Sequence, residues 1–419
     1  MIEIIPVKKL NAEISVPGSK YLANRLLIIA ALAKGTTILR NVPENEDIAS
    51  AIDALRKFGV NIGKEKDTLV IEGGALKTPL DEINVNNSGT LMRFIAGLSS
   101  LAGEVTINGS ERIRQRPING LLKSLNNLGV STKSESGYPP FTVFGGSLIG
   151  GKTRIGGEVS SQFISSLLLI SPLAKKTVEI IIDKTLVSKN YVDMTIELMK
   201  EFGIKVEREG YERFKVKPQN YRAGEYNIQG DWSSASYFLA AAMLVPGTVK
   251  INNIDTKSKQ GEAKFPELLV KTGGMLRKNS NWLQLIGFNE LTPLDIDMGD
   301  MPDVVQTLAV LGAFSKGTTR IKNIKHLAAK ESNRIKDTAI ELRKLGIKVE
   351  CTADELIIHG GCPHGALIDS HNDHRMAMSF AIAGLKIPGI KIKDPDCVNK
   401  SFPGFWDKLR EIGAGVINA

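Results

Sequence analysis

The amino-acid sequence predicts an α/β protein of two domains, each an inside-out α/β barrel with apolar helices inside and sheets outside. Three observations predict this fold: a sixfold internal repeat, an apolar helix in every repeat, and strand-like segments beside each helix. We expect six β-α-β-α-β-β repeats, three in each domain, because a unit with one all-apolar helix needs neighbouring units to cover it.

The repeat is clearest where the second helix of each unit ends, with a leucine or methionine four residues before a glycine. Successive glycines lie 67 to 74 residues apart, an interval too regular for chance. A glycine in this place is typical of a left-handed helix cap. The six glycines are Gly59, Gly129, Gly203, Gly273, Gly346 and Gly413.

The first helix of each unit has no polar face. In the fifth unit, apolar residues such as Val304, Leu308 and Leu311 cover every side of a helix with 3.6 residues per turn. Residues 318–324 follow Gly317 and are rich in β-branched side chains, which favour a strand. Because each apolar helix must be covered on all sides, three units group around their first helices.

The predicted N-terminal domain comprises residues 13–229 and holds repeats one to three. The C-terminal domain comprises residues 230–419 and holds repeats four to six. Residues 1–12 precede the first repeat as an extra strand that could pair with either domain, and we assign them to the C-terminal one. No low-complexity segment or long linker separates the two halves, so we expect short crossings.

The composition fits a globular protein of the cytoplasm. Apolar residues make up 42% of the chain and charged residues 24%, which is ordinary for globular proteins. The sequence shows no apolar leader and no run near the roughly 20 apolar residues of a membrane helix, so no membrane partner is expected. Three cysteines in 419 residues suit a reducing compartment.

The formal net charge of +9 has two interpretations, a solvated surface with surplus lysine or a site for anions. Aromatic residues make up only 6% of the chain and do not alternate with basic runs, so small anionic substrates are favoured over nucleic acid. Cys362, His364, His371 and His374 lie close together in the sequence, but their spacing fits no common zinc pattern. We therefore predict no metal site.

A polar turn precedes the first helix of every unit, so the repeats place six helix N-termini in equivalent positions. A helix N-terminus favours an anion by roughly 0.3–1 kcal/mol. One cation at such a turn is usually a solvated charge, but here cations recur at matched positions. The cations at or near helix starts are Lys20, Arg25, Arg93, Arg116, Lys330, Arg334, Arg375 and Lys400.

Two carboxylates, Asp303 and Glu331, stand among these cations at the starts of the two helices of the fifth unit. Each could be a helix cap or the charge partner of an arginine. The functional interpretation is acid–base catalysis, to which a well-placed group contributes about 10²–10⁴-fold. No nucleophile motif and no Walker-type phosphate loop occurs in the sequence.

These turns resemble the motifs of the 3-phosphoshikimate 1-carboxyvinyltransferase (EPSP synthase) family. The resemblance implies enolpyruvyl transfer from phosphoenolpyruvate (PEP) to the 5-hydroxyl of shikimate 3-phosphate, with release of phosphate, in the pathway to aromatic amino acids. It implies no cofactor, a monomer, and a site in the cleft between the domains. The matching segments appear in family order and are 17–25, 87–93, 116–118, 159–163, 302–303, 330–334, 372–377 and 400–403.

The resemblance also implies residue roles. Asp303 takes the proton of the 5-hydroxyl, Glu331 delivers a proton to the methylene carbon of PEP, and Lys20 joins them in catalysis. The residues implied for PEP are Lys20, Asn87, Gly89, Arg116, Gln162, Arg334, Arg375 and Lys400. Those implied for shikimate 3-phosphate are Lys20, Tyr21, Arg25, Ser160, Ser161, Gln162, Ser188, Tyr191, Asp303 and Lys330.

The sequence departs from the family pattern at three positions. Tyr21 stands where the family usually has serine, Phe94 where proline is frequent, and His326 where some members have asparagine. The resemblance implies that glyphosate competes with PEP, and Gly89 leaves the space that this longer ligand needs.

Two alternative functions remain. The first is the sister reaction on UDP-N-acetylglucosamine, which the lack of a cysteine in residues 109–116 disfavours. The second is RNA-end processing by proteins built from related units, which would show steeply salt-dependent RNA binding.

Overall fold

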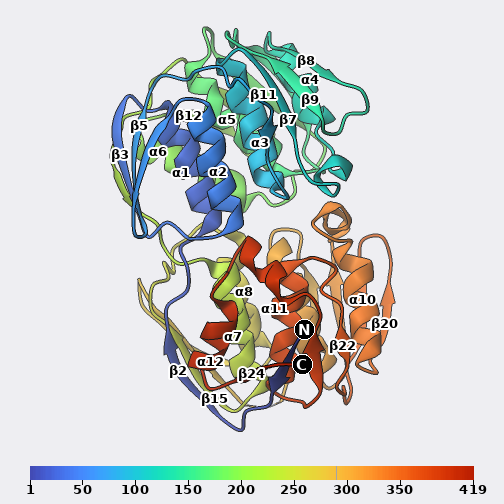
Figure 1. Cartoon of the computed structure of the whole chain (residues 1–419). Coiled ribbons are helices and arrows are strands. Elements are labelled where there is room, and N and C mark those ends of the chain that lie inside the picture. Colours follow the sequence, from blue (N-terminus) through green and yellow to red (C-terminus); the bar gives the residue numbers. More distant parts are fainter. Residues whose placement is uncertain (289) are drawn as a thin grey trace. The chain divides into compact units, whose positions relative to one another are not determined.

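The computed structural model describes residues 1–288 and 290–419 and divides into two compact units (Figure 1). The N-terminal unit is Gly18–Ile228, and the C-terminal unit combines Met1–Pro17 with Gln229–Ala419. The described strands form six four-stranded sheets. The α/β class, the six sheets and the two-domain inside-out architecture are as the sequence predicts.

All six sheets share one pattern, in which one strand pair is parallel and two are antiparallel. In the N-terminal unit the first sheet has the order β14-β3-β5-β4, the second β6-β7-β9-β8 and the third β10-β11-β13-β12. The bounds are β3 Gly35–Arg40, β4 Asn61–Glu65, β5 Thr68–Gly73, β6 Ile83–Asn84, β7 Glu104–Asn108, β8 Ser131–Ser134, β9 Phe141–Phe144, β10 Gly151–Gly156, β11 Val178–Asp183, β12 Val206–Glu209, β13 Arg213–Val216 and β14 Glu225–Asn227.

The C-terminal unit repeats this pattern with the orders β16-β17-β15-β2, β18-β19-β21-β20 and β22-β23-β1-β24. Its strands are β1 Ile2–Ile5, β2 Leu10–Ile14, β15 Gly247–Ile251, β16 Met275–Lys278, β17 Leu283–Gly287, β18 Asp295–Asp297, β19 Thr318–Lys322, β20 Lys348–Cys351, β21 Leu356–His359, β22 Leu367–Ile368, β23 Ile390–Ile392 and β24 Gly415–Asn418.

The strands next to the two chain crossings pair with distant repeats. Strand β2 precedes the first repeat in sequence but pairs in parallel with β15 of the fourth, and β14 precedes the fourth repeat but pairs with β3 of the first. The expected boundary after residue 12 therefore falls inside β2, and the division of the structure comes after Pro17, once this ladder is complete. Residues 1–12 lie with the C-terminal unit, where β1 pairs with β23 and β24.

Two helices follow in each repeat, and the first is buried on nearly every side. Helix α7 is buried at every position, and α1 at every position after Lys20. The first helices pack on one another, α3 on α5 and α9 on α11, so each unit has its own apolar core. The bounds are α1 Lys20–Leu32, α2 Glu46–Lys57, α3 Gly89–Leu98, α4 Asn119–Asn127, α5 Ser161–Ile170, α6 Asn190–Glu201, α7 Trp232–Leu244, α8 Phe265–Lys271, α9 Val305–Ala313, α10 Arg334–Lys344, α11 His374–Gly384 and α12 Phe405–Glu411.

The helix-ending glycines have the predicted conformation, since all six have positive φ angles between 79° and 112°. Short 3₁₀ helices complete the repeats: η1 Ser99–Leu101, η2 Ile113–Gln115, η3 Ser171–Leu173, η4 Gly261–Lys264, η5 Pro302–Val304, η6 Lys325–Ala329 and η7 Pro395–Lys400. Among the described residues, none of the helices combines the length and apolar character needed to cross a membrane.

Candidate active site

Several predicted site residues of the N-terminal unit lie at the starts of its first helices. Lys20 begins α1, Gly89 begins α3 and Ser161 begins α5. Ser160 caps α5, because its Oγ accepts a hydrogen bond of 3.3 Å from the backbone N–H of Gln162. The repeat therefore brings equivalent turns of three sheets to equivalent positions, as the sequence predicts.

Lys20 is paired with an acidic residue that the sequence did not single out. Its Nζ lies 3.0 Å from Oδ2 of Asp47, which stands in the first turn of α2. The two side chains are only 11% and 7% exposed, so water screens this pair little. Asp47 thus fixes the position of the lysine that the family motif marks as catalytic.

Arg93 joins the Gly89 turn to the start of α5. Its Nη1 donates to Oε1 of Gln162 at 2.7 Å and to the carbonyl oxygen of Gly89 at 3.0 Å. Gln162 in turn donates from Nε2 to Oγ1 of Thr90 at 2.8 Å. Two residues predicted to bind PEP, Gly89 and Gln162, are therefore neighbours.

Arg116 is the third member of this group. A Cβ atom built on Gly89 would lie 2.3 Å from Nη1 of Arg116 and 2.4 Å from its Cζ, so the guanidinium occupies the place of the missing side chain. Arg116 is 5% exposed and follows η2. Asn87 lies in the same turn, two residues before Gly89.

Arg25 is almost completely buried among neutral groups of α1, α5 and α6. Its Nε donates to Oγ1 of Thr195 at 2.7 Å, and its Nη1 and Nη2 donate to the carbonyl oxygens of Tyr21 and Tyr191. The ring centroid of Phe94 lies 5.4 Å from its Cζ, so the second departure from the family pattern packs against Arg25. Burial lowers the pKa of Arg25 to about 10, against the opposing effect of the two phenols.

Tyr21 and Tyr191 lie side by side, with ring centroids 5.0 Å apart and ring planes tilted by 55°. Ser188 precedes α6 in a left-handed conformation with φ of 53°, and its carbonyl oxygen accepts from the backbone N–H of Tyr191. Four residues predicted to bind shikimate 3-phosphate, Tyr21, Arg25, Ser188 and Tyr191, are therefore gathered in one region.

In the C-terminal unit, Arg334 is the centre of the predicted site. Its Nη1 donates to Oδ1 of Asp303 at 2.6 Å, its Nη2 to Oε2 of Glu331 at 2.9 Å, and its Nε to Oδ2 of Asp373 at 2.7 Å. Burial alone would lower the pKa of Arg334, but Asp373, Glu331 and Asp303 together raise it well above the ordinary value. The two carboxylates predicted to move protons share one guanidinium.

Each of these carboxylates also has a second cation. Nη2 of Arg375 lies 3.7 Å from Oδ2 of Asp303, and Nζ of Lys400 lies 3.8 Å from Oε1 of Glu331. Arg375 is oriented from the other side by Tyr237 on α7, whose hydroxyl accepts from Nη1 at 2.8 Å. Burial raises the pKa of Tyr237 to about 12, although Arg375 acts in the opposite direction.

His326 lies on η6, four residues before Lys330, and belongs to the same electrostatic environment. Burial lowers its pKa to about 3, Lys330 and Arg334 add to this effect, and Asp303 opposes it. The imidazole is therefore neutral near pH 7. Its Nε2 is buried and has no hydrogen-bond partner in the part of the chain that the structure describes.

Sequence reasoning missed three residues that hold predicted site residues in place: Asp47, Tyr237 and Asp373. Asp373 could have been found from the sequence, because it stands inside the Asn372–Arg375 motif. Tyr237 carries a weaker signal, a hydroxyl in an otherwise buried helix. Nothing in the sequence marks Asp47, since an acidic residue in the first turn of a helix is common.

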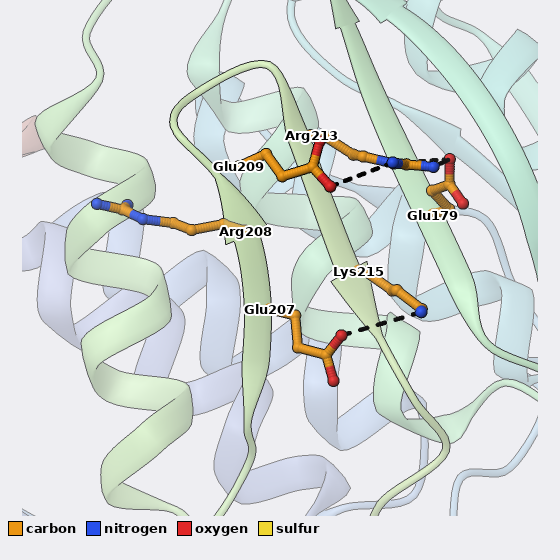
Figure 2. A pocket seen from close by; sticks show the side chains of 6 residues that line it. All are labelled: Glu179, Glu207, Arg208, Glu209, Arg213 and Lys215. Atoms are coloured by element: carbon orange, nitrogen blue, oxygen red, sulfur yellow. Dashed lines mark hydrogen bonds and ion pairs between the residues drawn. The ribbon is translucent and has the colours of Figure 1, made fainter.

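A cavity of about 310 Å³ in the N-terminal unit is lined by none of the predicted site residues. Figure 2 shows that charged side chains of β11, β12 and β13 line it. Arg213 pairs with Glu179 at 2.7 Å and with Glu209 at 3.2 Å. These side chains are partly exposed, and such pairs contribute roughly 0–1 kcal/mol each, so this is a solvated sheet surface.

Comparison with known proteins identifies the family. The family model described as EPSP synthase (3-phosphoshikimate 1-carboxyvinyltransferase) matches residues 4–409. The chain belongs to the EPSP synthase family. Members of this family transfer the enolpyruvyl group of PEP to shikimate 3-phosphate in the shikimate pathway.

Relatives of the EPSP synthase family match over nearly their whole length. The 3-phosphoshikimate 1-carboxyvinyltransferase of Marinomonas sp. (strain MWYL1) is 39% identical over 422 residues, covering 98% of this chain and 99% of the relative. The enzyme of that name from Methanosphaera stadtmanae is 36% identical, with the same coverage.

A solved EPSP synthase from Acinetobacter baumannii has a TM-score of 0.83 and 26% identity, covering 100% of this chain and 99% of that one. The fold and family predicted from the sequence are thus confirmed, and neither alternative function is supported.

Proposed function

We propose that this chain transfers the enolpyruvyl group of PEP to the 5-hydroxyl of shikimate 3-phosphate, using the residues that the sequence motifs mark. One observation carries the proposal for the site: Asp303 and Glu331 are both hydrogen-bonded to the buried guanidinium of Arg334, beside Arg375 and Lys400. A reaction between two anions needs cations to bind them, and proton transfer needs carboxylates within reach of the same atoms.

Asp303 is the general base in this proposal. Its two oxygens face Arg334 and Arg375, and two cations favour the ionised carboxylate. An ionised carboxylate can accept the proton of the 5-hydroxyl while the oxygen of that hydroxyl attacks C2 of PEP. The shared contact with Arg334 fixes the direction from which the carboxylate approaches its substrate.

Glu331 is the general acid in this proposal, and it must therefore carry a proton although it lies beside two cations. Arg334 and Lys400 both favour its carboxylate form before substrates bind. The phosphate and carboxylate of PEP draw these cations toward themselves, which raises the affinity of Glu331 for a proton. Glu331 then protonates the methylene carbon of PEP as PEP becomes bound.

The bond changes balance without a redox step. Protonation of the methylene carbon leaves C2 electron-poor, the 5-oxygen forms a bond to C2, and a tetrahedral adduct results. The C2–O bond to phosphate then breaks while the new methyl group returns a proton, which restores the double bond and releases phosphate. The proposal therefore includes no cofactor.

In this proposal, two partly overlapping sets of residues bind the two substrates. For shikimate 3-phosphate, Ser160 and Ser161 offer hydroxyl and backbone N–H groups at the start of α5, where a phosphate is favoured, and Lys330 adds a cation. The remaining residues of this subsite are Lys20, Tyr21, Arg25, Gln162, Ser188, Tyr191 and Asp303. PEP binds to Lys20, Asn87, Gly89, Arg116, Gln162, Arg334, Arg375 and Lys400.

We also propose that the protein acts in the cytoplasm as a monomer. The cysteines support the first point, since Cys351, Cys362 and Cys397 are free. The second rests on the family resemblance alone. Sedimentation of the ligand-free and substrate-bound protein tests it.

The test of the function is phosphate release from PEP in the presence of shikimate 3-phosphate, with UDP-N-acetylglucosamine as the competing acceptor. We expect phosphate release with the first acceptor and none with the second. The matched control is Arg213→Ala, which removes an arginine on the solvated sheet surface and should leave turnover unchanged. Release with UDP-N-acetylglucosamine alone would overturn the proposal.

A further inference from the structure

Glu341 is a fully buried carboxylate on α10, and the reaction described above makes no use of it. Its side chain is 0% exposed and accepts hydrogen bonds from three groups. Nε2 of His371 donates to Oε1 at 2.8 Å, the backbone N–H of Asp369 donates to Oε2 at 3.1 Å, and Nζ of Lys344 contacts both oxygens. Because a carboxylate accepts but does not donate, Nε2 of the imidazole carries the proton of this contact. Two of the three donors belong to one segment, so Glu341 holds that segment against α10.

The segment is the turn 369–373, which follows β22 and has an uncommon backbone. His371 and Asn372 both have φ of 51°, in the left-handed region that residues other than glycine seldom adopt. Such a conformation persists only where surrounding contacts fix it. Within the turn, the backbone N–H of His371 donates to Oδ1 of Asp369 at 2.8 Å. The contacts with Glu341 add to this local one and tie the turn to a helix.

Asp373, at the end of the turn, connects it to the proposed active site. Its Oδ2 accepts from Nε of Arg334 at 2.7 Å, and its Oδ1 accepts from the backbone N–H of Arg375 at 2.9 Å. Arg334 begins α10 seven residues before Glu341, so the two share one face of the helix, about 10 Å apart along its axis. Helix α10 therefore holds the turn at two points, one in the proposed site and one remote from it.

We propose that Glu341 is a positioning residue for the reaction: by holding the turn 369–373 it fixes Asp373, and through Asp373 the guanidinium groups of Arg334 and Arg375. This inference rests on the proposed function, in which both arginines bind PEP, and deepens it. When the remote contact is lost, Asp373 moves with the turn. Both arginines then lose the position from which they meet PEP.

Glu341→Gln breaks the remote contact with little change of shape. Both oxygens of Glu341 face donors, so the amide N–H₂ group must meet either His371 or the backbone of Asp369 without an acceptor. A displacement of about 1 Å can cost about 10²-fold in rate, and here the contact at Arg334 remains, so we expect kcat/KM for PEP to fall about tenfold. The Kd of shikimate 3-phosphate should change less than about twofold, because most of its proposed residues belong to the N-terminal unit. A role in stability alone would move neither constant while the protein stays folded.

His371→Asn tests the same contact from the turn, since asparagine tolerates a left-handed backbone. It should lower kcat/KM for PEP as Glu341→Gln does, and the double variant should lose less than the product of the two single losses. The matched control is Lys344→Gln, which removes the third partner of Glu341 and leaves the turn in contact. The side chain of Lys344 is 40% exposed, and exposed ion pairs contribute little, so its kinetics should equal those of the parent.

Hydrogen exchange follows the turn without any need for activity. The backbone amides of residues 369–375 should exchange about tenfold faster in Glu341→Gln and His371→Asn than in the parent, because opening of the turn is no longer opposed by the buried contact. Lys344→Gln should exchange at the parent rate.

Three outcomes would overturn the inference: kcat/KM for PEP within about twofold of the parent in both variants, losses that multiply in the double variant, or an equal loss in Lys344→Gln. Failure of the proposed function has a different signature. A parent protein that releases no phosphate from PEP contradicts that function, and hydrogen exchange then decides by itself whether Glu341 fixes the turn that carries Asp373.

Discussion

Arg25 in the N-terminal unit and Arg334 in the C-terminal unit are equally buried, yet they are held in opposite ways. Arg25 donates only to neutral oxygens, and its pKa is lowered to about 10. Arg334 donates to three carboxylates, and despite its burial its pKa is raised above the ordinary value. Among the described residues, Arg25 has no carboxylate partner, whereas Arg334 has three.

This difference separates binding from proton transfer. Around Arg25 an anion adds charge that the described contacts do not supply, so we expect this part of the proposed site to bind an anion without transferring protons. Around Arg334 the counter-ions of the cations are the carboxylates Asp303 and Glu331, so an arriving anion competes with them and changes their affinity for protons. Acid–base chemistry is therefore expected in the C-terminal unit.

The largest effect that tests this comparison is the loss of the acidic proton in Glu331→Gln. The amide keeps the shape and a contact with Arg334 but cannot protonate the methylene carbon. We expect turnover to fall about 10²–10⁴-fold while shikimate 3-phosphate still binds. Solvent deuterium should enter the methylene group derived from PEP in the parent and not in the variant.

The matched control is Glu350→Gln, which removes an exposed carboxylate on β20 of the same unit and should leave turnover unchanged. Equal deuterium incorporation in parent and Glu331→Gln would assign the acid to another residue. That result would also weaken the comparison, because Arg334 would then bind anions without controlling a proton.

Part of this site is predictable from the sequence. The repeat places the starts of the first helices in equivalent positions, so sequence pattern alone groups Lys20, Gly89 and Ser161 in the N-terminal unit. Several side chains that hold site residues in place are not predictable in this way, because their contacts cross between repeats. Arg375 meets Tyr237 across 138 residues, and Arg25 meets Thr195 across 170.

The fold shows the same limit. The apolar helices and their glycine caps are predictable from local sequence, because apolar residues on every side of a helix indicate that the helix is buried. Nothing in the sequence of strand β2 indicates that it pairs with β15 of a distant repeat. Its residues would suit a sheet edge in either domain equally well. Local pattern thus predicts elements and their grouping, and tertiary pairing decides where the domain boundary falls.

A pair of matched substitutions tests the two arginine environments directly. Arg334→Met leaves three carboxylates without their shared cation, and we expect it to lower the free energy of unfolding by about 3–5 kcal/mol. Arg25→Met removes a cation that had no counter-ion, so its loss of hydrogen bonds is offset by relief of a buried charge. We expect a change within about 1 kcal/mol.

Urea unfolding of both variants and the parent measures this difference. Arg25→Met should still lose affinity for shikimate 3-phosphate, since it removes a cation of the proposed subsite. A loss of stability in Arg25→Met as large as that in Arg334→Met would contradict the comparison, because it would reveal a counter-ion for Arg25 in the folded protein.

A more local effect concerns Arg116, whose guanidinium lies where a side chain at Gly89 would stand. In Gly89→Ala the new methyl group would meet the guanidinium at 2.3 Å, so Arg116 must move. Overpacking of this kind costs about 1–3 kcal/mol, and the flexible end of Arg116 can yield, so we expect the lower end of that range. The KM for PEP should rise about tenfold, and the inhibition constant of glyphosate should rise more, because the longer ligand needs the space that the methyl group fills.

Gly224→Ala is the control for this last prediction, since a Cβ there meets no atom within 4 Å. The double variant Gly89→Ala with Arg116→Lys separates the two causes. If displacement of the guanidinium causes the weaker PEP binding, the methyl group adds little once the guanidinium is gone, and the two changes are not additive. Additive effects on PEP would place the methyl group in contact with the ligand itself, and Gly89 would then limit ligand size without acting through Arg116.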